Sequence, residues 1–157
     1  MPKVFIVSWV DYCNKYGMGY ALTDGSIGVH FNDGSSMVLS PSRQYVLFPL
    51  FKFHGNSSIS RFRNLEYIIP GKREIPPVRK NYLVTDHPEK LKTKMYLMKH
   101  FEKYMLDRLY GDYEYTYQDL QRIKELDYVN RYFRDKHVTS FQMSHGVFQV
   151  SFSLYFD

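Results

Sequence analysis

The sequence predicts an α+β protein in which an antiparallel sheet is followed by a long helix and then by a C-terminal hairpin. Short β-type runs alternate with Gly-containing turns over residues 3–40, whereas apolar residues recur every three or four positions over about residues 87–109. The 157 residues are 44% hydrophobic and 18% aromatic. A chain of this length and composition can bury a core, which argues against a disordered tail.

Four β-type runs come first: KVFIV (3–7), GYALT (19–23), SIGVHF (26–31) and SMVLS (36–40). Asp24-Gly25 and Asp33-Gly34 lie between consecutive runs, and Gly supplies the positive φ that a tight hairpin needs. We therefore expect an antiparallel meander.

Residues 41–80 are less regular. Two further strand candidates are QYVLFPLF (44–51) and LEYII (65–69), whereas the stretches rich in Gly, Ser and Pro predict exposed loops. We expect an insertion at about residues 41–64 and a last strand of this sheet at NYLVT (81–85).

The long helix is predicted to begin after Asp86, which has Glu89 at capping-box spacing and Pro88 in the first turn. Its apolar stripe, expected to pack in the core, is Leu91, Met95, Met98, Phe101, Met105 and Leu109. A second helix is predicted to begin near Thr116. Its inward residues are Leu120, Ile123, Leu126 and Val129.

The C-terminal hairpin is predicted from HVTSFQM, the turn Ser-His-Gly and VFQVSFSLYFD. Phe148, Val150 and Phe152 alternate with Gln149 and Ser151 in its last strand. This alternation predicts that the face with the Phe residues is buried.

The charge and cysteine content indicate which partners and which cellular compartment to expect. The chain has 21 Lys and Arg against 16 Asp and Glu. The net charge of +5 favours an acidic partner (a phosphopeptide, a nucleic acid or an anionic surface) or serves solubility alone. Cys13 is the single cysteine, so no intramolecular disulfide can form and an intracellular protein is expected. We expect no membrane span, because no apolar run approaches about 20 residues.

Catalytic motifs are lacking. The six histidines never fall at metal-ligand spacing, so no metal is expected. GMGYAL lacks the third Gly and the Lys of a phosphate loop, and Cys13 has no activating base nearby in sequence. We therefore expect no cofactor and no enzymatic activity in this chain. Nucleic-acid binding is a less favoured alternative, because the basic segments also carry acids and match no known fingerprint.

Three segments resemble the polo boxes of the polo-like kinases. WVDYCNKYGMGYALTDGSIGVHFNDGSSMVL (9–39) is similar to the start of the first box, and YLVTDHPEKLKTKMYLMKHFEKYM (82–105) to its passage from strand to helix. LDYVNRYFRDKHVTSFQMSHGVFQVSFS (126–153) is similar to the linker and first hairpin of the second box.

The resemblance implies a six-stranded antiparallel sheet with a long packed helix, followed by a linker helix and an incomplete second-box hairpin. We expect the first box at residues 1–110, the linker with its helix at 111–135 and the truncated second box at 136–157.

In this family two boxes hold a phosphopeptide in the cleft between them. The resemblance implies that peptide is bound by Trp9, Val10, Asp11, Leu109 and Tyr110. It also implies an aromatic side groove formed by Tyr12, Tyr16, Leu97, Phe101 and Tyr104. His100 stands where the family has a tyrosine. A plain buried role for Trp9 stays open, because large aromatic residues mostly serve cores.

The family holds the phosphate with a His and, two residues later, a Lys on the second box. In this sequence Tyr155 or Phe156 falls at the His position, and Asp157 or no residue at the Lys position. Replacing two cations by an aromatic residue and an acid removes charge-assisted hydrogen bonds. We therefore expect binding of peptides with weakened dependence on phosphate.

The main hypothesis is a non-catalytic targeting module of a polo-like kinase, with peptide segments of partner proteins and a kinase domain in cis or trans as partners. The alternatives are a structural self-associating unit, in which the chain forms a homodimer, and a small basic nucleic-acid binder. The resemblance implies a role in mitosis and the cell cycle. It also implies a location in the cytoplasm or nucleus, at spindle poles, centrosomes and kinetochores.

Overall fold

The computed structural model describes residues 4–41, 63–108 and 124–153. The first sheet has the order β1-β2-β3-β4-β5-β6 and is antiparallel throughout. Its strands are β1 (Ile6–Tyr12), β2 (Gly17–Leu22), β3 (Ile27–Phe31), β4 (Ser36–Leu39), β5 (Asn64–Ile69) and β6 (Val78–Leu83). The short 3-10 helix η2 (Glu89–Leu91) leads into α2 (Lys92–Arg108). A second antiparallel sheet consists of β7 (Val129–Arg134), β8 (Val138–Met143) and β9 (Phe148–Phe152).

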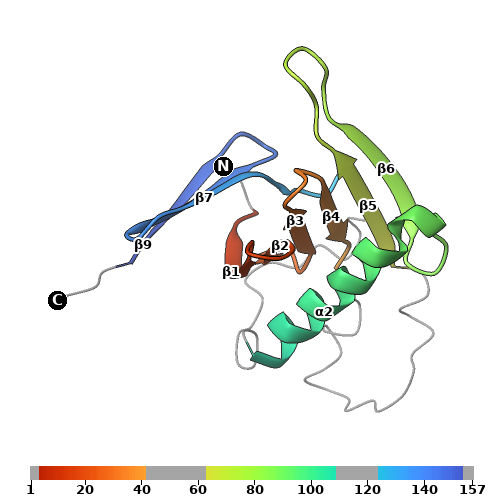
Figure 1. Cartoon of the computed structure of the whole chain (residues 1–157), viewed down its shortest axis with the longest axis horizontal. Helices are drawn as coiled ribbons and strands as arrows, with labels where there is room; N and C mark the ends of the chain where they lie inside the picture. The colour runs from red at the N-terminus through yellow and green to blue at the C-terminus, as the bar shows by residue number, and fades with distance from the viewer. Residues whose placement is uncertain (1–3, 42–62, 109–123, 154–157) are drawn as a thin grey trace.

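Helix α2 crosses one face of the first sheet, and the second sheet extends away from the first on the side of β1, far from β6 (Figure 1). The predicted α+β fold with a six-stranded antiparallel sheet, a long packed helix and a small second sheet is therefore confirmed. The Gly positions in the tight turns are confirmed as well, because Gly25 and Gly34 have φ of 85° and Gly146 has φ of 89°.

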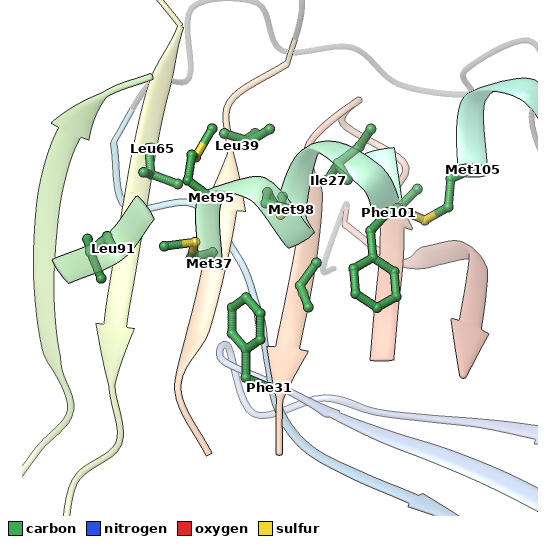
Figure 2. Close-up of a cluster of buried hydrophobic side chains, with 12 residues drawn as sticks. Ile27, Phe31, Met37, Leu39, Leu65, Leu91, Met95, Met98, Phe101 and Met105 are labelled. Atoms are coloured by element: carbon green, nitrogen blue, oxygen red, sulfur yellow. The ribbon is translucent and has the colours of Figure 1, made fainter. Parts of the chain in front are cut away.

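The core between the first sheet and α2 contains the apolar stripe predicted for the helix (Figure 2). Leu91, Met95, Met98, Phe101 and Met105 are all buried and pack on residues of the strands below. Leu109, the last residue predicted for this stripe, lies outside the described residues.

Strand β2 is buried on both faces, because α2 lies on one side and the second sheet on the other. Two glycines make this possible by leaving room for aromatic rings. A Cβ atom on Gly19 would lie 2.5 Å from Cδ1 of Phe101 in α2, and one on Gly28 would lie 2.2 Å from Cζ of the buried Tyr20. The close spacing of glycines in this stretch therefore has a packing cause.

Hydrogen bonds at two places connect the first sheet to the segment that leads into the second sheet. The buried Glu66 carboxylate accepts hydrogen bonds from Leu126 N at 3.1 Å and from Arg79 Nη1 at 2.7 Å. Arg79 Nη1 also donates to Leu126 O at 2.9 Å, and its guanidinium lies 5.0 Å from the centre of the Tyr128 ring. At the first residue of β7, Val129 N donates to the Tyr20 hydroxyl at 3.0 Å.

Several predicted element boundaries differ from the structure. Strand β1 extends to Tyr12 rather than ending at Val7, and β6 begins at Val78, three residues before the predicted start. The capping box is absent, because Pro88 occupies the N-cap of η2 without a side-chain cap hydrogen bond. QYVLFPLF and the predicted start of the second helix lie outside the described residues.

The predicted second helix does not reach its last two inward residues. Leu126 and Val129 are buried as expected, but Leu126 lies in an irregular segment and Val129 begins strand β7. A strand is favoured at this position because Val129–Arg134 pairs along β8. The C-terminal hairpin is thus confirmed as β8 and β9, and it has a third strand that the sequence analysis missed.

The prediction for the faces of β9 is wrong. Phe148, Val150 and Phe152 are 65%, 47% and 69% exposed. The register pairs Gln149 with the buried Phe141, so the face with Gln149 and Phe141 is the inner one. Gln149 turns inward because its side-chain amide forms two hydrogen bonds with the backbone of β1, as described below.

Candidate functional site

Strand β1 forms an edge of the first sheet and carries the predicted peptide-binding residues Trp9, Val10 and Asp11. In the described part of the chain it pairs with β2 along one side only. Its register shifts between Ile6 and Ser8, as at a β-bulge. An edge strand with unpaired backbone groups is a template for the addition of another strand.

Gln149 of β9 occupies the first part of this edge. Ile6 N donates to Gln149 Oε1 at 2.8 Å, and Gln149 Nε2 donates to Ile6 O at 2.8 Å. The side-chain amide therefore pairs with the backbone as a neighbouring strand would, and it fixes the second sheet beside β1. The sequence analysis missed this residue, because a single Gln 143 positions away from its partner gives no periodic signal.

Trp9 lies where the two sheets meet. Its ring packs edge to face on Phe141 of β8, with ring centroids 5.1 Å apart, and it is half-buried against the cluster between the sheets. The buried members of this cluster are Val4, Ile6, Met18, Tyr20, Leu22, Val129, Phe141 and Met143. Trp9 thus has a structural role, and its partial exposure leaves part of the side chain accessible.

Asp11 links β1 to β7. Its Oδ2 atom accepts hydrogen bonds from the Tyr132 hydroxyl at 2.8 Å and from Arg134 Nη1 at 3.3 Å, while Oδ1 accepts one from Cys13 N at 2.9 Å. Partial burial alone would raise the Asp11 pKa, but the hydrogen bonds from Cys13, Tyr132 and Arg134 outweigh it and lower the pKa. The carboxylate therefore stays ionised and connects β1 of the first sheet to β7 of the second.

Cys13 lies beside this carboxylate. Burial raises the pKa of its thiol to about 12, and the neighbouring Asp11 adds to the increase. A thiol with such a pKa is protonated near neutral pH and is a poor nucleophile. This environment agrees with the expectation that Cys13 is chemically inert.

An aromatic groove of about 630 Å³ opens between α2 and the end of β1. It brings together all the residues predicted for it, namely Tyr12, Tyr16, Leu97, Phe101 and Tyr104. Val10 also lines it, as do His100, which stands at the family's tyrosine position, and two residues that the prediction did not include, Tyr96 and Lys103. The Tyr12 and Tyr16 rings are stacked with centroids 5.7 Å apart, and the Tyr96 and His100 rings meet edge to face at 4.4 Å.

The remaining predicted site residues lie outside the described residues. These are Leu109 and Tyr110, predicted to contact peptide, and Tyr155, Phe156 and Asp157, which the resemblance assigns to the positions of the family's phosphate-binding pair.

Acid should weaken the link between Asp11 and β7. Because the Asp11 pKa is lowered in the folded protein, its hydrogen bonds stabilise the fold above the unfolded pKa of about 4, and this stabilisation is lost as pH falls through the folded pKa. We expect Asp11→Asn to reduce the free energy of unfolding in urea by about 1–2 kcal/mol at pH 7. The difference from the wild type should shrink as pH falls from about 5 towards 3.

Asp86→Asn is the matched control for this measurement, because Asp86 is exposed in the loop before η2. This control should change the free energy of unfolding little at either pH. A difference between wild type and Asp11→Asn that is equal at pH 7 and pH 3 would contradict the role assigned to the Asp11 carboxylate.

No group of three or more His, Cys, Asp or Glu side chains is placed to hold a metal ion within residues 4–41, 63–108 and 124–153. In the same residues, no helix is both long and apolar enough to cross a membrane.

These features define a class of α+β domain in which one helix covers a six-stranded antiparallel sheet and a second small sheet packs on the opposite face of β2, beside the edge strand. The family model described as "POLO box duplicated region" matches residues 14–95. The chain belongs to the polo-box family.

The relatives are polo-like and other serine/threonine kinases. "Probable serine/threonine-protein kinase CCRP1" of Zea mays is 32% identical over 96% of this chain, and "Serine/threonine-protein kinase PLK1" of Xenopus tropicalis is 28% identical over 97%. The chain spans only 21% and 22% of the length of these relatives.

Solved structures of the budding yeast Cdc5 polo-box domain have the same fold. The complex with an Spc72 phosphopeptide matches with a TM-score of 0.68 and 25% identity, over 97% of this chain and 48% of that chain. The complex with the Dbf4 polo-interacting region matches with a TM-score of 0.67 and 26% identity, over 98% and 49% of the two chains.

Proposed function

We propose that this chain is a non-catalytic targeting module that binds peptide segments of partner proteins along the Trp9 edge of β1. The observation that carries the proposal is the position of the aromatic groove, which begins at Val10 and Tyr12, where the open edge of β1 ends. The similar Cdc5 domains bind an Spc72 phosphopeptide and a Dbf4 polo-interacting region, which supports the proposal.

Peptide would add to β1 as an extra strand beyond the segment that Gln149 occupies. Its backbone would pair with the open edge near Trp9 and Asp11, and an apolar side chain would enter the aromatic groove. Tyrosine-rich walls suit this task, because each ring gives a large contact area at a low cost in conformational entropy.

Phosphate dependence is proposed to be weak. The resemblance places Tyr155 or Phe156 at the family's phosphate-binding His, and Asp157 or no residue at its Lys. Arg134 reaches this edge through its ion pair with Asp11, at 3.3 Å, and its side chain is 56% exposed. Because Arg134 is already paired with a carboxylate, it would hold a phosphate less strongly than a free pair of cations.

The test is fluorescence anisotropy with a labelled Ser-phosphoThr peptide and its unphosphorylated counterpart. We expect comparable affinity for both peptides and a loss of about tenfold or more for Trp9→Ala. Phe148→Ala is the control, since it removes an exposed aromatic side chain from the outer face of β9. Lack of binding to either peptide would overturn the proposal, and tight binding of the phosphopeptide alone would overturn the weak phosphate dependence.

The proposal includes a kinase domain, in cis or in trans, whose substrates the module would select. By the same resemblance the module would act in mitosis, at spindle poles, centrosomes and kinetochores.

Self-association is a second candidate, favoured by the outer face of the second sheet. Phe133, Phe148, Val150 and Phe152 are 47–69% exposed, and the register of β7, β8 and β9 places them on one face. A twofold dimer would bring two copies of this apolar face together. Sedimentation velocity tests it: a monomer at concentrations on the order of 50 µM would exclude a stable dimer.

A further inference from the structure

A second cavity, of about 640 Å³, lies along α2, and of the described residues that line it, Lys103 alone also lines the aromatic groove. Its apolar wall comprises Leu39, Val84, Met95 and Leu106. Leu39 and Met95 lie next to each other where α2 crosses β4 (Figure 2). We name it the Arg63 cavity, after the cation that lines it.

Arg63, which lines this cavity, has one unsatisfied hydrogen-bond donor. Its side chain is only 9% exposed; Nε donates to Ser40 O at 2.7 Å and Nη1 to Glu102 Oε1 at 2.6 Å. The remaining nitrogen, Nη2, is buried, and within the described part of the chain it has no hydrogen-bond partner. Buried donors are nearly always paired, so this nitrogen indicates a place for an acceptor that the described residues do not supply.

The charges around the cavity favour an anion. Arg63, Lys99 and Lys103 line it together with one carboxylate, Glu102. Three cations against one acid leave a positive balance after the ion pair between Arg63 and Glu102 is counted. A volume in this range is typical of sites for small molecules.

We propose that the Arg63 cavity binds a small amphiphilic carboxylate, whose head group pairs with Arg63 and Lys99 and whose apolar tail lies along Leu39 and Met95. A carboxylate oxygen is the acceptor whose geometry suits a guanidinium N–H. The proposal does not depend on peptide binding at β1, because the apolar wall and Arg63 are separate from the aromatic groove.

The experiment follows the methyl resonances of methionine by NMR in the full chain, with decanoate as the probe. Met95 lines the cavity, whereas Met18 is buried between the two sheets and serves as an internal reference. We expect decanoate to shift the Met95 signal saturably and leave the Met18 signal in place. The neutral analogue decan-1-ol should bind at least about tenfold more weakly.

Two variants test the charge contribution. Lys99→Gln should weaken decanoate binding about three- to tenfold, whereas Lys92→Gln, on the same helix but outside the cavity, should leave it unchanged. Arg63→Gln should abolish saturable binding of decanoate. If this substitution also shifts the Met18 signal, it has disturbed the fold, and the comparison of Lys99→Gln with Lys92→Gln is then the test. Equal affinity for decanoate and decan-1-ol, an unaffected Lys99→Gln variant or an unmoved Met95 signal would overturn the proposal. Trp9→Ala should have no effect on decanoate, which separates this site from the peptide site.

Discussion

Replacing Glu66 by alanine is expected to lower the free energy of unfolding by about 3–5 kcal/mol, because it breaks a buried ion pair and leaves other polar groups unsatisfied. The Glu66 side chain has no exposed surface, and its two oxygens hold Arg79 Nη1 and Leu126 N. Without the carboxylate, the Leu126 N–H loses its acceptor inside the core and Arg79 keeps only the Leu126 carbonyl as a described hydrogen-bond partner.

Urea unfolding at pH 7 measures this effect, and Glu89→Ala is the matched control. Glu89 is also paired with a cation, Lys92 at 3.1 Å, but its side chain is 86% exposed. Exposed pairs of this kind contribute about 0–1 kcal/mol, so Glu89→Ala should change stability little. A loss below about 1 kcal/mol for Glu66→Ala would show that the junction between the two sheets does not depend on this carboxylate.

The first sheet could be predicted because its signals are local. Gly25 and Gly34 mark two of its turns, and the stripe from Leu91 to Met105 identifies the face of α2 that packs on the strands. The aromatic groove was predicted through the resemblance, and the structure brings its residues into one cavity. Local signals fail at the capping box, where Asp86 and Glu89 have the required spacing but Pro88 occupies the N-cap of η2.

The hydrogen bonds between the two sheets could not be predicted from the sequence. Glu66 and Leu126 are 60 residues apart, and Tyr132 lies 121 positions from Asp11. Single polar residues at such separations have no periodic pattern, and their pairing follows from the packing of the sheets. Period-2 alternation has a similar limit, since it shows that β9 has two different faces but not which of them meets another part of the protein.

The faces of the second sheet therefore have unequal roles, although both are aromatic. Phe141 on the inner face is fully buried and contacts the rings of Trp9 and Tyr132, at centroid distances of 5.1 and 5.5 Å. Phe148 on the outer face is 65% exposed. Since Trp9 is the single tryptophan of the chain, its fluorescence reports directly on the contact with Phe141.

Phe141→Ala is expected to lower the free energy of unfolding by about 3–5 kcal/mol, because it leaves a cavity between the sheets. Under conditions where the variant is still folded, Trp9 emission should shift to longer wavelength, since the ring loses its apolar neighbour. Peptide affinity should fall as well if the Trp9 edge binds peptide, because the indole ring would no longer be held in one orientation.

The same substitution at Phe148 is the control, and it should cost about 0.5 kcal/mol or less and leave Trp9 emission unchanged. Equal losses for the two variants would mean that the outer face is also covered, as in a dimer, and would favour self-association. A large loss for Phe141→Ala with unchanged peptide affinity would assign Trp9 to the core between the sheets and place peptide binding elsewhere. The pair of variants thus separates the structural role of Trp9 from its proposed role in binding.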